Sequence, residues 1–174
     1  MKFLKALLDL ILSFFVEPSY DVDPKTLDMN TEPVEQPVVP PNPRELLVAE
    51  ARKWLGKDAS PENKADKNVA CVESVITIIR GLYPDFPKTL STIELDYYLT
   101  NSPHFRYVNT PRDGAIIISP RRAEYGHVGI CMTTDIIASN DSRSGLFELN
   151  YSLGEWIKEM RNNRGLKIFF YEPI

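Results

Sequence analysis

The sequence predicts an α+β domain in which helices come first and an antiparallel sheet follows. Three observations support this fold class. Apolar residues recur at helical spacing in residues 44–55 and 68–80, short apolar runs bounded by turn residues fill residues 115–171, and no internal repeat or nucleotide-type glycine loop is visible. At 174 residues the chain is long enough for one domain with a substantial core and an additional segment.

The composition excludes several classes of function. Hydrophobic residues make up 43% and charged residues 25%, which is ordinary for a globular protein, and a net charge of -4 argues against a nucleic-acid partner. Two cysteines are too few for a disulfide framework. With only two histidines and no CxxC pair, a structural zinc site is not expected either.

Residues 1–16 predict a helix with a broad apolar face. Its polar residues recur three or four positions apart, and Asp9 interrupts an apolar run that is shorter than the ~20 residues a bilayer crossing needs. No small-x-small cleavage site follows before Glu17. We therefore expect a membrane-surface anchor or a signal-like segment, with docking on a partner protein as the alternative.

Residues 17–43 predict an extended linker. Residues 18–43 hold seven of the 14 prolines, with acidic residues between them, and such a stretch cannot bury a core. A folded domain over residues 44–174 is expected to follow.

Three helices are expected at the start of this domain. Pro43 opens the first, over residues 44–55, and Gly56 ends it. Asn68 is a suitable N-cap for the second, which Gly81 and Pro84 stop. A third is expected over residues 89–99.

The second half predicts strands and one more helix. The helix opens with a capping box formed by Ser152 and Glu155 and ends near Gly165. Apolar runs and alternation predict strands over residues 115–119, 125–132, 136–140, 146–150 and 167–171.

Cys71 is the first candidate for chemistry because it falls in the first turn of the second helix. The positive end of the helix dipole can lower the pKa of a thiol there, and the free backbone N–H groups can hold an oxyanion. The alternative is that Cys71 is a small buried apolar residue.

His127 is the candidate base. Gly126 and Gly129 leave room around its ring, and a bend at residues 133–135 would bring Asn140 or Asp141 opposite it on the next strand. A cysteine, a histidine and a polar side chain on the second ring nitrogen form a nucleophile, a general base and an orienting group. Asn140 and Asp141 both remain candidates for the orienting role. Asn140 fits best by residue type, and Ser139 is a neighbour in the same turn of strand.

Other conspicuous residues are expected to have structural roles. His104 is expected in a surface loop, and Cys131 in the core without a disulfide to Cys71. Trp54 and Trp156 are expected to anchor the flanking helices.

The runs NVACVESV, GAIIISP, YGHVGI and IIASNDSRSGLFELNYSLGEW resemble the NlpC/P60 and CHAP group of papain-like cysteine peptidases, especially phage and prophage members. The resemblance covers roughly residues 44–172. It implies a papain-like fold, with Cys71 as nucleophile, His127 as base and a polar residue on the next strand. It also implies hydrolysis of a peptidoglycan amide, by an endopeptidase or an N-acetylmuramoyl-L-alanine amidase, with no metal or cofactor.

Two further functions remain open. The chain could keep this fold as a non-catalytic module that binds the cell wall or serves in phage assembly, or it could hydrolyse a protein or lipid amide. The N-terminal segment favours a location at the cell envelope, on a membrane, outside the cell or on a virion.

Overall fold

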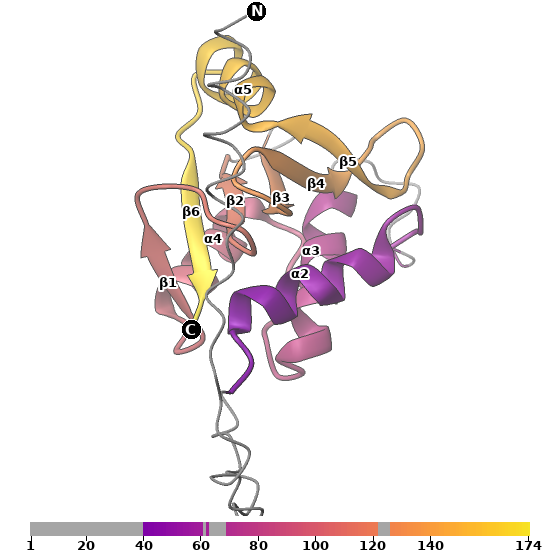
Figure 1. Ribbon diagram of the computed structural model, residues 1–174. Coiled ribbons are helices and arrows are strands. Elements are labelled where there is room, and N and C mark those ends of the chain that lie inside the picture. Colours follow the sequence, from indigo (N-terminus) through magenta and orange to yellow (C-terminus); the bar gives the residue numbers. More distant parts are fainter. Residues whose placement is uncertain (1–39, 61, 63–68, 122–125) are drawn as a thin grey trace, which may run out of the picture. The chain divides into compact units, whose positions relative to one another are not determined.

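The computed structural model describes residues 40–60, 62, 69–121 and 126–174 (Figure 1). The helix predicted over residues 1–16, most of the predicted linker and the predicted N-cap Asn68 lie outside these residues. Among the described helices, none has the length and apolar character that a membrane crossing requires.

The domain is α+β, as predicted, with three helices before most of the sheet (Figure 1). The helices are α2 (Pro43–Trp54), α3 (Ala70–Leu82) and α4 (Thr92–Asn101). A short α5 (Leu153–Trp156) and the π-helix η2 (Ile157–Asn163) come near the end of the chain. The strands are β1 (Phe105–Val108), β2 (Ile116–Ser119), β3 (His127–Cys131), β4 (Ile136–Asn140), β5 (Phe147–Ser152) and β6 (Phe169–Pro173).

The six strands form one antiparallel sheet in the order β1-β6-β2-β3-β4-β5. β2 and β3 pair along their length, with Ser119 opposite His127. β3 and β4 pair only at Ile130–Ala138 and Cys131–Ile137, so the first residues of β3 have no ladder partner on that side. His127 and Val128 of β3 and Asn140 of β4 border this unpaired stretch.

Local sequence accounts for the helix starts. The Asn42 side chain accepts a hydrogen bond from the N–H of Arg44, and the Pro43 ring suits the first turn of α2. The N-cap of α3 is Val69, and its side chain makes no capping bond. α4 begins at Thr92, three residues later than predicted, because the Ser91 hydroxyl caps it by accepting the N–H of Glu94.

Two apolar cores lie on the two faces of the sheet. One face packs against α2, α3 and α4, and its sheet residues include Ile118, Val128 and Ala138. The other face, with Ile117, Cys131 and Ile137, packs against Trp156 of α5 and Met160 of η2. Since side chains alternate along a strand, neighbouring residues of β3 and β4 contribute to opposite cores.

Two elements were not predicted. β1 is an edge strand in which only Phe105 is buried, so it lacks the apolar alternation that identifies a strand from sequence. η2 continues the predicted last helix with a wider turn, and helical spacing does not distinguish a π-helix from an α-helix.

Candidate functional site

Cys71 is the second residue of α3, and its thiol contacts the sheet. Its side chain is 3% exposed, and the backbone N–H groups of Val128, Val72 and Cys71 lie near its sulfur and act to lower the pKa of the thiol. The backbone of Cys131 bonds to Ala115 and Gly114 beside β2, so by alternation the N–H of Val128 points the other way, towards β4. The N–H that lies near Cys71 Sγ is therefore on the side of β3 that faces β4.

Burial dominates the acidity of this thiol. Removal from water raises the pKa of Cys71 to about 11, although the N–H bonds from Val128, Val72 and Cys71 lower it. The prediction that the helix N-terminus would lower this pKa is therefore outweighed in the folded chain. Cys71 is a neutral thiol at pH 7.

His127 begins β3, and its ring is held by Ser139 of β4. The distance from His127 Nε2 to Ser139 Oγ is 3.1 Å, and Ser139 Oγ in turn donates to Asn150 Oδ1 over 2.8 Å. A chain of polar contacts therefore runs from the imidazole across β4 to β5. It occupies one ring nitrogen, Nε2.

Two aromatic side chains enclose the imidazole. Trp156 stacks on it with ring centroids 5.0 Å apart, and Tyr151 meets it edge-on at 5.6 Å. Burial and the positive charge of Arg164 lower the pKa of His127 to about 4, against a smaller raising effect of Asp141. The imidazole is neutral at pH 7 and is therefore able to accept a proton.

The two residues predicted to orient His127 have other partners. Asn140 is buried, and its Oδ1 accepts a hydrogen bond from Ser74 Oγ of α3 over 3.3 Å. Asp141 accepts the N–H groups of Arg143 and Ser144 within its own loop, and these bonds keep the pKa of its carboxyl low. The hydrogen-bond partner of His127 Nε2 is Ser139.

Strand alternation explains this difference. Ser139 and Asn140 are neighbours on β4, so their side chains lie on opposite faces of the sheet. Asn140 is on the face of Cys71 and α3, whereas Ser139 is on the face of His127 and Trp156. Among the described residues, no hydrogen bond joins Cys71 Sγ to either nitrogen of His127.

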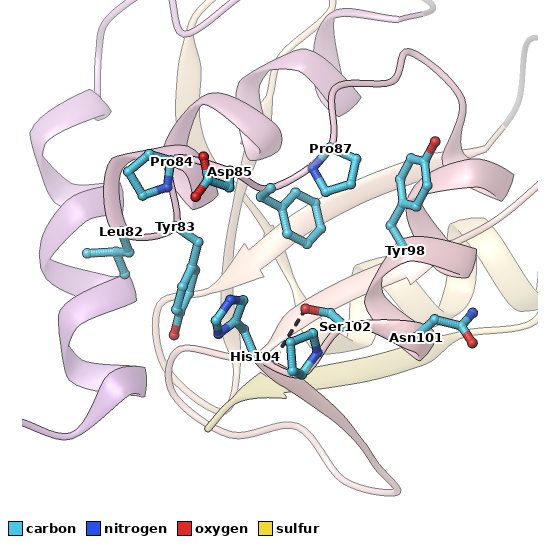
Figure 2. A pocket seen from close by; sticks show the side chains of 11 residues that line it. Leu82, Tyr83, Pro84, Asp85, Pro87, Tyr98, Asn101, Ser102 and His104 are labelled. Atoms are coloured by element: carbon cyan, nitrogen blue, oxygen red, sulfur yellow. Dashed lines mark hydrogen bonds between the residues drawn. The ribbon is translucent and has the colours of Figure 1, made fainter.

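A separate pocket lies between the end of α3 and the end of α4 (Figure 2). It has a volume of about 460 Å³, and its walls are mainly aromatic and proline side chains. Tyr83 and His104 stack at its edge with centroids 4.5 Å apart. His104 is exposed just before β1, as predicted for a surface-loop residue. Neither Cys71 nor His127 lines this pocket.

Sequence reasoning did not select Asn150 or Ser74, and it gave Ser139 only as a neighbour of the favoured residues. Asn150 is two residues after Glu148, which faces Ser139, so alternation predicts its face once the pairing of β4 with β5 is known. Ser74 is one helical turn after Cys71 and could have been selected as a polar residue on the sheet-facing side of α3.

The prediction that both cysteines are unpaired and that Cys131 lies in the core is confirmed. Compared with models of protein families and with the sequences of curated proteins, the chain gives no match.

Proposed function

We propose that the chain is a cysteine-dependent amide hydrolase with Cys71 as nucleophile and His127 as general base. The observation that carries the proposal is that the backbone N–H of Val128, the residue after His127, lies beside Cys71 Sγ and acts to lower the pKa of the thiol. A thiol at a helix N-terminus is therefore next to the strand that begins with a neutral imidazole. The order of helices and antiparallel strands supports the papain-like fold that the NlpC/P60 and CHAP resemblance implies.

The reaction would proceed by acyl transfer to sulfur. His127 takes the thiol proton while Cys71 Sγ attacks the amide carbonyl, and the backbone N–H of Cys71 is available to the oxyanion. The intermediate collapses when the imidazolium gives its proton to the leaving amine. Water activated by His127 then hydrolyses the thioester, releasing the acid and the free thiol.

Both groups are neutral before the reaction, because the pKa of Cys71 is raised and that of His127 is lowered. Proton transfer would therefore accompany attack on the carbonyl instead of preceding it as a stable ion pair. Catalytic hydrogen bonds are often long or poorly aligned until the substrate is bound. Because Cys71 and His127 lie on opposite faces of the sheet, the mechanism also requires the start of β3 to rearrange so that the thiol and the imidazole come into contact.

Peptidoglycan is the substrate that we propose, because the resemblance covers the cysteine helix, the histidine strand and the strands that follow. The bond cleaved is within the stem peptide or cross-bridge, or between muramic acid and the first alanine. Residues 1–16 would hold the enzyme at a membrane surface or on a phage structural protein, at the cell envelope, outside the cell or on a virion.

The test is the release of soluble fragments and new amino groups from purified peptidoglycan by the full chain. Cys71→Ala should abolish release, and Cys131→Ala, which truncates the other buried thiol, should retain it. His127→Ala and His104→Ala form a second matched pair. Release that survives Cys71→Ala would exclude the thiol mechanism, and the masses of the fragments would identify the bond.

A non-catalytic module that binds the wall or serves in assembly is the second candidate. It is favoured by the burial of Cys71 and by the lack of a hydrogen bond between Cys71 and His127 among the described residues. It predicts that the chain pellets with peptidoglycan or membranes, releases nothing, and is unaffected in binding by Cys71→Ala.

A further inference from the structure

We propose that Ser139 and Asn150 are positioning residues that hold His127 in a single neutral tautomer, with the hydrogen on Nε2 and the lone pair on Nδ1. The catalytic meaning of this inference rests on the proposed function. The tautomer itself is a property of the folded chain and can be measured without any activity.

The tautomer follows from counting hydrogens. The Oδ1 atom of Asn150 can only accept, so the single hydroxyl hydrogen of Ser139 is used in the 2.8 Å bond to it. Ser139 Oγ is then left with lone pairs only on the side of His127, 3.1 Å away. Nε2 must therefore be the nitrogen that carries hydrogen, and Nδ1 is the basic one.

Asn150 lies at a β-bulge on the face of His127. In the β4–β5 ladder Ile137 faces Tyr151 and Ala138 faces Leu149, so Asn150 is the extra residue between two paired positions. Because Glu148 faces Ser139, alternation along β5 puts Asn150 on the same face as Ser139. The bulge then keeps the next residue, Tyr151, on this face too, where its ring contacts His127.

The aromatic contacts oppose rotation of the ring about the Cβ–Cγ bond, which would move Nε2 away from Ser139. Trp156 covers one face of the imidazole with its plane inclined by only 18°, and Tyr151 meets the ring edge-on. The indole N–H of Trp156 is itself fixed by Ser119 Oγ at 3.2 Å. Within the described residues Nδ1 has no hydrogen-bond partner, so it is the ring nitrogen that is free to accept a proton.

The direct measurement is a long-range ¹H–¹⁵N correlation spectrum of the full chain labelled with ¹⁵N, at pH 7.5. The chain has two histidines, so His104→Gln leaves one imidazole to assign. We expect a pyridine-like shift for Nδ1 of His127 and a pyrrole-like shift for Nε2. The reverse pattern, or averaged shifts, would overturn the proposal. The reverse pattern would also mean that the Asn150 amide is turned over and donates to Ser139.

Variants separate the role of Asn150 from general packing. Asn150→Asp keeps an acceptor for the Ser139 hydroxyl and should keep the Nε2–H tautomer. Asn150→Ala and Ser139→Ala remove the constraint and should give averaged shifts. Asn163→Ala, which removes an amide bonded to Glu159 on the surface, is the matched control. If Asn150→Ala does not fold, Ser139→Ala and Asn150→Asp still test whether these side chains hold the tautomer. An unchanged tautomer in Ser139→Ala would overturn the inference.

Activity is the second readout. If the hydrolase proposal holds, Asn150→Ala should lower kcat about 10- to 100-fold with little change in KM, the range typical of groups that orient a histidine. Asn150→Asp should restore most of the rate. Failure of the hydrolase proposal would show as no release by the wild type, while the spectrum would still test the tautomer.

Discussion

The imidazole of His127 and the indole of Trp156 lie face to face, with ring centroids 5.0 Å apart and planes inclined by 18°. The indole is fully buried and joins the candidate base to the core between the sheet and η2. This contact means that the site and the stability of the domain depend on the same side chain.

Truncation of Trp156 should be severely destabilising. Trp156→Ala should lower the free energy of unfolding by about 3–5 kcal/mol because it leaves a large cavity. Trp156→Phe keeps an aromatic face on His127 but loses the bond to Ser119, and should cost about 1 kcal/mol for that bond in addition to the smaller ring. Urea unfolding measures both, with Trp54→Phe as control. Equal losses for the Ala and Phe variants would contradict the packing role.

Stability should fall in mild acid because of His127. Its pKa in the fold, about 4, lies below the ordinary 6.5, so the unfolded chain takes up a proton at a higher pH than the folded chain. The free energy of unfolding should therefore decrease as the pH falls from 6.5 towards 4, by about 2 kcal/mol at pH 5.

Urea unfolding of wild type and His127→Gln between pH 7 and pH 5 isolates this effect. The decrease should be largely absent from His127→Gln and present in His104→Gln. If the free energy of unfolding falls equally with pH in wild type and His127→Gln, the pKa of His127 is not lowered in the folded chain.

Both thiols should react slowly in the folded chain. Burial raises the pKa of Cys71 from an ordinary 9.0 to about 11, and that of Cys131 to about 12. At pH 8 the thiolate fraction of Cys71 should therefore be about 100-fold lower than in the unfolded chain, and the thiolate is the reactive form. Alkylation by iodoacetamide in the Cys131→Ala background, with and without urea, measures this. Rapid alkylation at pH 7 would instead indicate a thiolate paired with an imidazolium.

Gly129 should not tolerate a side chain. A Cβ at this position would lie 2.7 Å from the carbonyl oxygen of Ala138 and 2.8 Å from Cγ2 of Ile137, so Gly129→Ala must push β3 and β4 apart. We expect a loss of about 1–3 kcal/mol of stability. Gly154→Ala is the control, because its Cβ would meet only Ser152 Oγ at 4.0 Å, within a helix. Thermal unfolding of the two variants should separate them clearly, and similar midpoints would contradict the close approach of β3 to β4.

Local patterns in the sequence determined much of this fold. Pro43 and Asn42 at the start of α2, the apolar stripe of α3, and the Ser152–Glu155 capping box each act over a few residues, so they can be identified without tertiary contacts. The same holds for the placement of Cys71 in a first helical turn and of His127 at the start of a strand.

Only the tertiary structure decided which side chains meet. Asn140 fits the orienting role by residue type, but its neighbour Ser139 bonds His127, because one position along β4 changes the face of the sheet. The bulge that keeps both Asn150 and Tyr151 on the face of His127 depends on how β5 pairs with β4, and it has no local sequence signal. The raised pKa of Cys71 and the lowered pKa of His127 come from burial between distant segments, which periodicity along the chain does not specify.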